Sequence, residues 1–160
     1  MFAVFRTLVY ASLFIGLFLV FIPGRILARV GITPVTTLGT PELIGLTLVV
    51  LGITLAILCV LTLAVIGKGT PAPFDPPRRL VMAGPYRFVR NPMYIGAGLA
   101  LFGAAIFYRS LALALYAAVF VIITHLFVML YEEPHLRRVF GQPYDDYLKT
   151  VHRWIPTWRS

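Results

Sequence analysis

The sequence predicts an all-α polytopic membrane protein with about four transmembrane helices. Its 160 residues are 59% hydrophobic and only 12% charged, with a mean hydropathy of +0.88. A soluble domain has roughly 25% charged and 45–50% apolar residues, and a chain of this length has too little interior to bury such an apolar excess. Four uncharged stretches, of which the third is short, can also cross a hydrocarbon layer of about 30 Å. They are segments 7–24, 43–67, 92–108 and 110–131.

The first and last spans each need a justification. Segment 7–24 follows Arg6, as the apolar part of a secretory signal peptide would. No small-residue cleavage site follows closely, so we expect a retained helix. Segments 92–108 and 110–131 meet at Arg109 and Ser110. Because so short a connection makes two helices antiparallel neighbours, the sequence predicts that the last two helices form a tight helical hairpin.

The basic residues lie mostly on one side of these spans. The chain has 14 Lys and Arg against 6 Asp and Glu, which gives a net charge of +8. Eleven of the 14 precede the first span, lie between the second and third, or follow the fourth, and 3 lie on the other side. The positive-inside rule therefore places both termini in the cytoplasm, in a cytoplasmic or inner membrane. Because the excess follows the topology, we expect contacts with membrane lipids and no nucleic-acid partner.

Two cytoplasmic segments are predicted to cover the helix ends, within a single membrane-embedded domain 1–160. Segment 68–92 holds six of the 12 prolines, so it cannot be helical throughout. Its part 69–77 suits a linker, whereas 78–91 carries apolar side chains that need burial. Segment 132–156 is predicted to form an interfacial helix and an extended end, with rings suited to the membrane–water boundary. The rings of this C-terminal region are Tyr144, Tyr147, Trp154 and Trp158.

Glu132 and Glu133 are the first candidates for chemistry. They follow the apolar fourth span, where they either mark the point at which the helix leaves the bilayer or belong to a site. Acids oppose the macrodipole at a helix C-terminus and meet an anionic cytoplasmic surface, so Lys or Arg would be the less costly ending. His125 lies seven residues before Glu132 on the same helix face. A histidine at membrane depth marks a site or an interhelical hydrogen bond.

The start of the third span combines a helix signal with small residues. Asn91 is a candidate N-cap, and Pro92 suits the first turn of a helix. Gly96 and Gly98 follow. Small residues permit either close helix packing or close approach of the backbone to a ligand, and the spacing does not distinguish the two.

Several other kinds of site are excluded or disfavoured. Cys59 is the single cysteine, which excludes an intramolecular disulfide, and its apolar surroundings indicate a packing residue. The three histidines have no metal-ligand spacing with carboxylates, so we expect no metal. No phosphate-binding glycine loop and no nucleophile elbow occur.

Two parts of the chain together resemble a known family. Residues 83–94 read Ala-Gly-Pro-Tyr-Arg-Phe-Val-Arg-Asn-Pro-Met-Tyr, which is similar to a signature of the isoprenylcysteine carboxyl methyltransferase family. Residues 132–156, from the Glu-Glu-Pro-His start to the Trp-Ile-Pro end, resemble that family's second signature. The related phospholipid methyltransferases share a Gly-x-Gly and a Glu-Glu pair. The resemblance covers about residues 78–156, half the chain, and depends on the joint order of these elements.

The resemblance implies an integral-membrane methyltransferase that uses S-adenosylmethionine and no metal. In that family the cofactor lies at the cytoplasmic ends of the last helices, under the loop and the C-terminal segment. By match, the expected cofactor-binding residues are Leu80, Val81, Tyr86, Asn91, Met93, Tyr94, Gly98, Glu132 and Glu133. Arg90 and Arg153 are the expected catalytic residues, because they could meet the carboxylate of a substrate.

The methyl acceptor is expected to be lipophilic, with two head groups left open. One is an isoprenylcysteine-like carboxylate, and the other is the amine of a phospholipid. Eukaryotic isoprenylcysteine enzymes place an arginine one turn before the Glu pair, where this chain has Val128. The alternative function is a non-enzymatic module that binds a lipid or quinone. That alternative leaves unexplained why so many polar residues gather on one membrane face.

Overall fold

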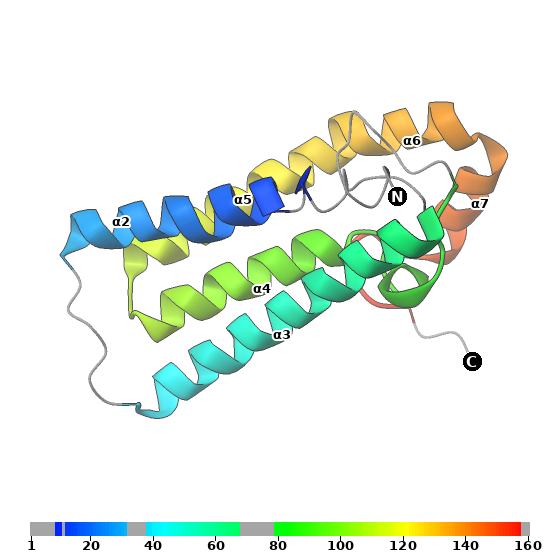
Figure 1. The fold of residues 1–160 in the computed structure, drawn as a ribbon. Coiled ribbons are helices and arrows are strands. Elements are labelled where there is room, and N and C mark those ends of the chain that lie inside the picture. Colours follow the sequence, from blue (N-terminus) through cyan, green and yellow to red (C-terminus); the bar gives the residue numbers. More distant parts are fainter. Residues whose placement is uncertain (1–8, 11, 32–37, 68–78, 158–160) are drawn as a thin grey trace.

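The computed structural model describes residues 9–10, 12–31, 38–67 and 79–157, and Figure 1 shows them as a bundle of helices. These described residues contain no strand. The predicted linker 69–77, the start of the first span and the ring of Trp158 lie outside them. The elements are η1 (Ile15–Phe21), α2 (Ile22–Val30), α3 (Thr40–Thr62), η2 (Leu63–Gly67), η3 (Gly84–Arg87), α4 (Pro92–Phe107), α5 (Leu111–Phe127), η4 (Val128–Glu132), α6 (Glu133–Phe140) and α7 (Gln142–Thr150).

The helices run along the bundle in alternating directions. The N-terminal helix, Ser12–Val30, contains η1 and α2. It lies beside α5, and α4 lies between α5 and α3 (Figure 1). The end of α2, the start of α3 and the turn from α4 to α5 are therefore at one end of the bundle, which we call the hairpin end. The elements η3, α6 and α7 are at the opposite end, which we call the site end.

The lengths and surfaces of these helices confirm the predicted fold class. Among the described residues, three helices are long and apolar enough to cross a membrane: Ser12–Val30, Thr40–Gly67 and Leu111–Phe140. The third predicted span, 92–108, corresponds to α4, which is apolar but has only 16 residues. Large apolar side chains such as Leu58 and Leu115 are exposed on the outside of the bundle. Helices with apolar outer faces are typical of a membrane-spanning bundle.

Glycines build the close packing between α3 and α4. Gly45 packs on Gly103 near the hairpin end. Gly52 packs on Gly96, seven residues closer to the site end on each of the two antiparallel helices. A Cβ atom added to Gly45 would lie 2.6 Å from the backbone nitrogen of Phe107, which is closer than real Cβ atoms approach. Small residues at such positions let two helix backbones touch. Gly96 therefore serves close helix packing, the first of the two interpretations of its sequence.

The N-terminal helix ends later than predicted. We expected its membrane span to end at residue 24, but the helix continues to Val30 and ends at Gly31. Gly31 has a φ of 69°, the left-handed conformation that glycine adopts at helix C-termini. Arg25 and Arg29 therefore lie within the helix. Long basic side chains can reach water from a helix end and interact favourably with the C-terminal dipole.

The last span also continues past its predicted end at residue 131. The elements α5, η4 and α6 form one continuous helix, Leu111–Phe140. Pro134 conflicts with an α-helix, because it lacks an N–H group and its ring collides with an earlier carbonyl. The wider π-helical turn of η4 ends at Glu132, two residues before Pro134, and accommodates this conflict. Glu132 and Glu133 therefore lie inside a helix, and the prediction that they end one is wrong.

The predicted hairpin between the last two spans is confirmed. The helices α4 and α5 are joined through Arg109 and Ser110, and Arg109 has a φ of 48°. This left-handed conformation is uncommon for a residue other than glycine and suits a tight reversal. The Ser110 hydroxyl accepts a hydrogen bond from the Leu113 N–H at 3.3 Å and so caps α5.

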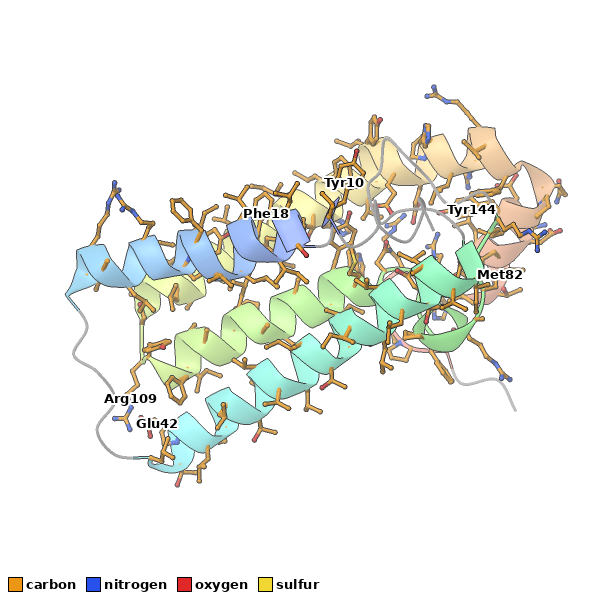
Figure 2. The ribbon with its side chains drawn as sticks, viewed as in Figure 1. Tyr10, Phe18, Glu42, Met82, Arg109 and Tyr144 are labelled. Atoms are coloured by element: carbon orange, nitrogen blue, oxygen red, sulfur yellow. The ribbon has the colours of Figure 1, made fainter. Side chains whose placement is uncertain are left out.

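An ion pair joins this hairpin to the start of α3. The helix α3 begins at Thr40 rather than at residue 43, so Glu42 lies in its first turn. Arg109 Nε donates to Glu42 Oε1 at 2.7 Å, and Figure 2 shows the two side chains together at the hairpin end. Glu42 Oε2 also accepts a hydrogen bond from the Gly39 N–H at 2.9 Å. One buried carboxylate therefore caps α3 and holds the α4–α5 turn beside it.

Candidate active site

Two segments far apart in sequence close the site end. The loop 79–91 lies against residues 151–157, which follow α7. We call these two segments the cover. Backbone hydrogen bonds run from the Arg90 N–H to the His152 carbonyl (3.0 Å) and from the Thr157 N–H to the Phe88 carbonyl (2.8 Å). The cover is therefore one ordered unit, as the apolar content of the loop predicted.

A small apolar cluster fixes the cover to α7. Tyr144, Tyr147 and Val151 are buried together. Leu80 of the loop packs against them, as do three partly buried side chains of α6 and α7. These three are Leu136, Phe140 and Leu148. The loop is thus held by side chains as well as by backbone hydrogen bonds, and Leu80 takes part in that packing.

Glu133 of α6 lies at the centre of the ion pairs that hold the cover. Its carboxylate accepts two hydrogen bonds from Arg153, from Nε and Nη2, both at 2.8 Å. Arg90 Nη1 lies 2.8 Å from the same carboxylate, and the Glu133 side chain is only 13% exposed. This bidentate pairing raises the pKa of Arg153. One acid in the last long helix therefore binds both segments of the cover at once.

Glu132 has different surroundings, although it is the adjacent residue. Its Oε2 accepts a hydrogen bond from the Tyr94 hydroxyl at 3.1 Å. Glu132, Cys59 and Tyr94 all lie close enough to Tyr86 to act on it electrostatically. Among the described residues, no Arg, Lys or His forms an ion pair with Glu132. The site end therefore contains one carboxylate with two arginine partners and one with a tyrosine partner.

Burial keeps the tyrosines of this region in their neutral form. Burial is the main cause that raises the pKa of Tyr86 well above its ordinary value, and the neighbouring Cys59 and Glu132 add to it. Burial likewise raises the pKa of Tyr144 to about 12 and raises that of Tyr147. A neutral hydroxyl can donate, and Tyr147 donates to the Tyr86 carbonyl at 2.6 Å. Tyr86 is thus held in place from α7.

An apolar cavity of about 380 Å³ lies next to the polar cluster formed by Glu132, Tyr94 and Tyr86. The N-terminal helix, α3, α4 and α5 all contribute to its wall. Met93 and Tyr94 line it at the start of α4, so Tyr94 faces the cavity while its hydroxyl reaches Glu132. Val119 and Ile123 of α5 also line the cavity and are more than half exposed. The cavity therefore opens on the outer, apolar surface of the bundle and ends beside the polar cluster.

The comparison with known families adds a decisive observation to this geometry. A family model described as phospholipid methyltransferase matches residues 41–143, which include α3, α4, α5 and the Glu pair. The chain belongs to the phospholipid methyltransferase family. This family is related to the isoprenylcysteine carboxyl methyltransferases, so the resemblance seen in the sequence is confirmed at this broader level. A search of curated proteins and a search of solved structures each give no match.

In this phospholipid methyltransferase family member, most of the expected site residues lie at the site end. Val81 is buried in the cover, and Asn91 is buried where the cover joins α4. The Asn91 side chain does not cap α4, in contrast to our prediction, because its Nδ2 donates to the Arg153 carbonyl at 3.2 Å. Gly98 lies apart from the cluster and faces Val121 of α5, where an added Cβ would make an ordinary contact at 3.5 Å.

The structure also places residues in the site of this methyltransferase that sequence reasoning missed. Tyr147 supports Tyr86 through the hydrogen bond to its carbonyl. Trp154 Nε1 donates to His125 Nδ1 at 2.9 Å, which explains the histidine at membrane depth. The spacing of His125 signalled an interhelical or site role, but its partner is 29 residues away in the tail. No group of three or more potential metal ligands occurs in the described parts of the chain.

Proposed function

We propose that this protein transfers a methyl group from S-adenosylmethionine to a lipophilic acceptor at the membrane surface. The observation that carries the proposal is the position of Glu132. This carboxylate lies close to Tyr86 of the cover and, through Tyr94, adjoins an apolar cavity that opens toward lipid. A polar, cationic cofactor and an apolar acceptor would each find a suitable environment, and the two environments meet at Tyr94.

The residues present fit S-adenosylmethionine. This cofactor has an ammonium and a sulfonium, and a partly buried carboxylate without a basic partner in the described residues suits a cationic ligand. The rings of Tyr86 and Tyr94 can stack on adenine or face the sulfonium. Arg90 Nε is buried without a hydrogen-bond partner among the described groups. A buried N–H donor without a partner is rare, and the cofactor's own carboxylate would satisfy it.

The described residues then divide the work of the reaction. When bound, the cofactor supplies the methyl group, which leaves sulfur by in-line displacement. Such a reaction depends on positioning and on the exclusion of water. Glu132 and Tyr94 orient the cationic part, and the cover keeps water out. Glu133 holds Arg90 and Arg153 in the cover, so we assign it to positioning. Val81 and Met93 would provide the apolar wall.

The acceptor's head group is proposed from the partners of Arg90 and Arg153. We expected these arginines to meet a substrate carboxylate, but both form ion pairs with Glu133. The observation favours an amine head group, as on an amino-phospholipid, over the isoprenylcysteine-like carboxylate. Incubation with labelled S-adenosylmethionine and either lipid distinguishes them: methylated phosphatidylethanolamine is expected, and a methyl ester of a prenylcysteine would contradict the amine.

Both termini are proposed to face the cytoplasm. Eleven of the 14 basic residues belong to the segments that precede, join or follow the spans on the side of the cover, and the positive-inside rule assigns that side to the cytoplasm. The cofactor would therefore arrive from the cytoplasm, where it is made, and the acceptor from the membrane. A reporter fused to the C-terminus that is active only in the cytoplasm checks this orientation.

Cofactor binding by purified protein in nanodiscs tests the proposal directly. Glu132→Gln removes the charge and keeps the shape, and titration calorimetry is expected to show S-adenosylmethionine affinity lowered by about tenfold to a hundredfold. Glu42→Gln is the matched control, because Glu42 is a buried acid at the hairpin end. Wild-type affinity in Glu132→Gln, or no binding by wild type, would contradict the proposal. A copurified lipid without cofactor binding would instead support a non-enzymatic module.

A further inference from the structure

The N-terminal helix contributes to the site although the family match does not include it. The match begins at residue 41, whereas this helix is Ser12–Val30. Nevertheless, Phe14, Phe18 and Leu19 of the helix line the apolar cavity. The part of the wall on this side therefore comes from residues outside the family pattern. A wall of that kind is suited to set a property that differs between members, such as the shape of the acceptor.

Two phenylalanines of this helix form the inner face of that wall. The ring of Phe14 lies 6.4 Å from that of Tyr94 in an edge-to-face arrangement, and both Phe14 and Phe18 pack near the ring of Phe120 on α5. Aromatic pairs at such distances prefer tilted geometries and define a rigid surface. Because Tyr94 also binds Glu132, Phe14 is one ring away from the polar cluster. The two phenylalanines thus form one side of the cavity, and Phe14 adjoins Tyr94.

A hydrogen bond from α5 holds Phe18 in position along the N-terminal helix. The Tyr116 hydroxyl on α5 donates to the Phe18 carbonyl at 3.0 Å. Phe18 lies in the π-helical segment η1, where wider turns leave carbonyls available for partners outside the helix. The N-terminal helix is otherwise lightly packed. In its most apolar part only 6% of the residues are buried, against 28% in the corresponding parts of Thr40–Gly67 and Leu111–Phe140. The contact therefore positions Phe18 on a helix that few other contacts hold.

We infer that Phe14 and Phe18 determine which hydrocarbon tail of the methyl acceptor fits into the cavity. This inference rests on the proposed function, since it assigns the tail of the same acceptor. A cavity of about 150 Å³ lined by apolar side chains binds benzene, so the cavity of about 380 Å³ has room for a longer segment of lipid tail. Its mouth at Val119 and Ile123 faces the apolar surroundings. Its inner end at Tyr94 places the head group beside Glu132.

Methylation of acceptors that differ only in tail length tests the inference. Phosphatidylethanolamines with short and long chains are the acceptors, with S-farnesyl and S-geranylgeranyl N-acetylcysteine as a parallel pair. The variant Phe14→Ala/Phe18→Ala enlarges the cavity and is expected to shift the ratio of kcat/KM toward the longer tail by at least about tenfold. The change should appear in KM, while the affinity for S-adenosylmethionine stays constant. Phe18→Trp narrows the cavity and should shift the ratio in the opposite direction.

A matched control and a second readout separate this inference from the proposed function. Leu17→Ala removes an exposed side chain of the same helix and should leave the ratio unchanged. Cross-linking by a long-chain fatty alcohol with a diazirine next to its hydroxyl group reports binding in the inner end of the cavity without catalysis. We expect labels on Met93 and Tyr94, fewer in Phe18→Trp, and a constant label on the lipid-facing Leu58.

The outcomes are distinguishable. Unchanged tail ratios in both phenylalanine variants, or no label on Met93 and Tyr94, would overturn the inference even if wild type binds S-adenosylmethionine. Size-dependent labelling that follows the variants, in a protein that binds no S-adenosylmethionine, would support tail selection by Phe14 and Phe18 and overturn the proposed function instead.

Discussion

The two ends of the bundle use the same chemistry for different purposes. At the hairpin end, Glu42 pairs with Arg109 at 2.7 Å, and the Arg109 side chain is 67% exposed. At the site end, Glu133 pairs with Arg90 and Arg153, each at 2.8 Å, and these side chains are 12% and 29% exposed. The first pair joins two helix connections at the surface. The second is sheltered and joins two segments separated by about 60 residues of chain.

The difference teaches how adjacent acids acquire separate roles. At the hairpin end one carboxylate both caps a helix and binds the arginine. At the site end Glu132 and Glu133 are adjacent carboxylates, and Glu133 pairs with both Arg90 and Arg153. Glu132 is left with a tyrosine as its described partner. A partly buried carboxylate that no basic side chain among the described residues neutralises has an unfavourable desolvation energy, so a cationic ligand bound there would stabilise the folded protein.

The largest effect is expected from the removal of Glu133. Glu133→Ala leaves two sheltered arginines without their partner, and loss of one partner of a buried ion pair costs about 3–5 kcal/mol. We expect the loop 79–91 and residues 151–157 to become accessible to protease while the transmembrane helices persist. Limited proteolysis in nanodiscs followed by mass spectrometry measures this. Cleavage no faster than in wild type would mean that Glu133 does not hold the cover.

An intermediate effect is expected at the glycine packing that connects the two ends. In Gly52→Ala the new methyl group collides with the Gly96 carbonyl and the backbone of Ala100, and overpacking costs about 1–3 kcal/mol. Thermal unfolding should begin at a lower temperature, and both ends should be affected. Gly98→Ala is the control, since its methyl group would make an ordinary contact with Val121. Equal unfolding temperatures for the two variants would contradict the close α3–α4 packing.

The smallest effect is expected at the hairpin end. Arg109→Ala removes a partner that is 67% exposed, and the buried Glu42 keeps its hydrogen bond from the Gly39 N–H. The loss of stability should therefore be smaller than for the sheltered Glu133 pairs. Cofactor affinity and protease resistance of the cover should match those of wild type, with a slightly lower unfolding temperature. Thermal scans, calorimetry and proteolysis on one preparation measure all three. A marked loss of cofactor affinity would show that the two ends of the bundle are coupled rather than independent.

The fold was predictable because each part of it depends on local patterns. Uncharged runs define helices, and Arg109-Ser110 between two such runs defines a hairpin. The ends of the helices were predicted less well. Gly24 and Glu132 look like boundaries in sequence, but helix caps and π-turns decide the ends, and Pro134 is tolerated only because η4 precedes it.

The sequence predicted which polar residues gather at one end of the bundle, but it did not predict how they pair. The motifs and the family resemblance place five polar residues in one candidate site: Arg90, Tyr94, Glu132, Glu133 and Arg153. They do not show which acid binds which residue, because that depends on the face each side chain takes after the π-turn. The contribution of Phe14 and Phe18 is equally hidden. Apolar residues in a span all look alike in sequence, and only packing distinguishes a cavity wall from a surface that faces lipid.

The shortness of α4 has a consequence for the surrounding bilayer. Its 16 residues rise about 24 Å, less than the roughly 30 Å of a typical hydrocarbon layer. Hydrophobic mismatch of this kind is relieved by local thinning of the membrane or by displacement of the short helix. Because α4 starts at Pro92, close to Tyr94, we expect the lipid head groups at the site end to lie deeper in the bilayer there. The membrane itself would then bring the reacting group of a lipid down to the level of Glu132.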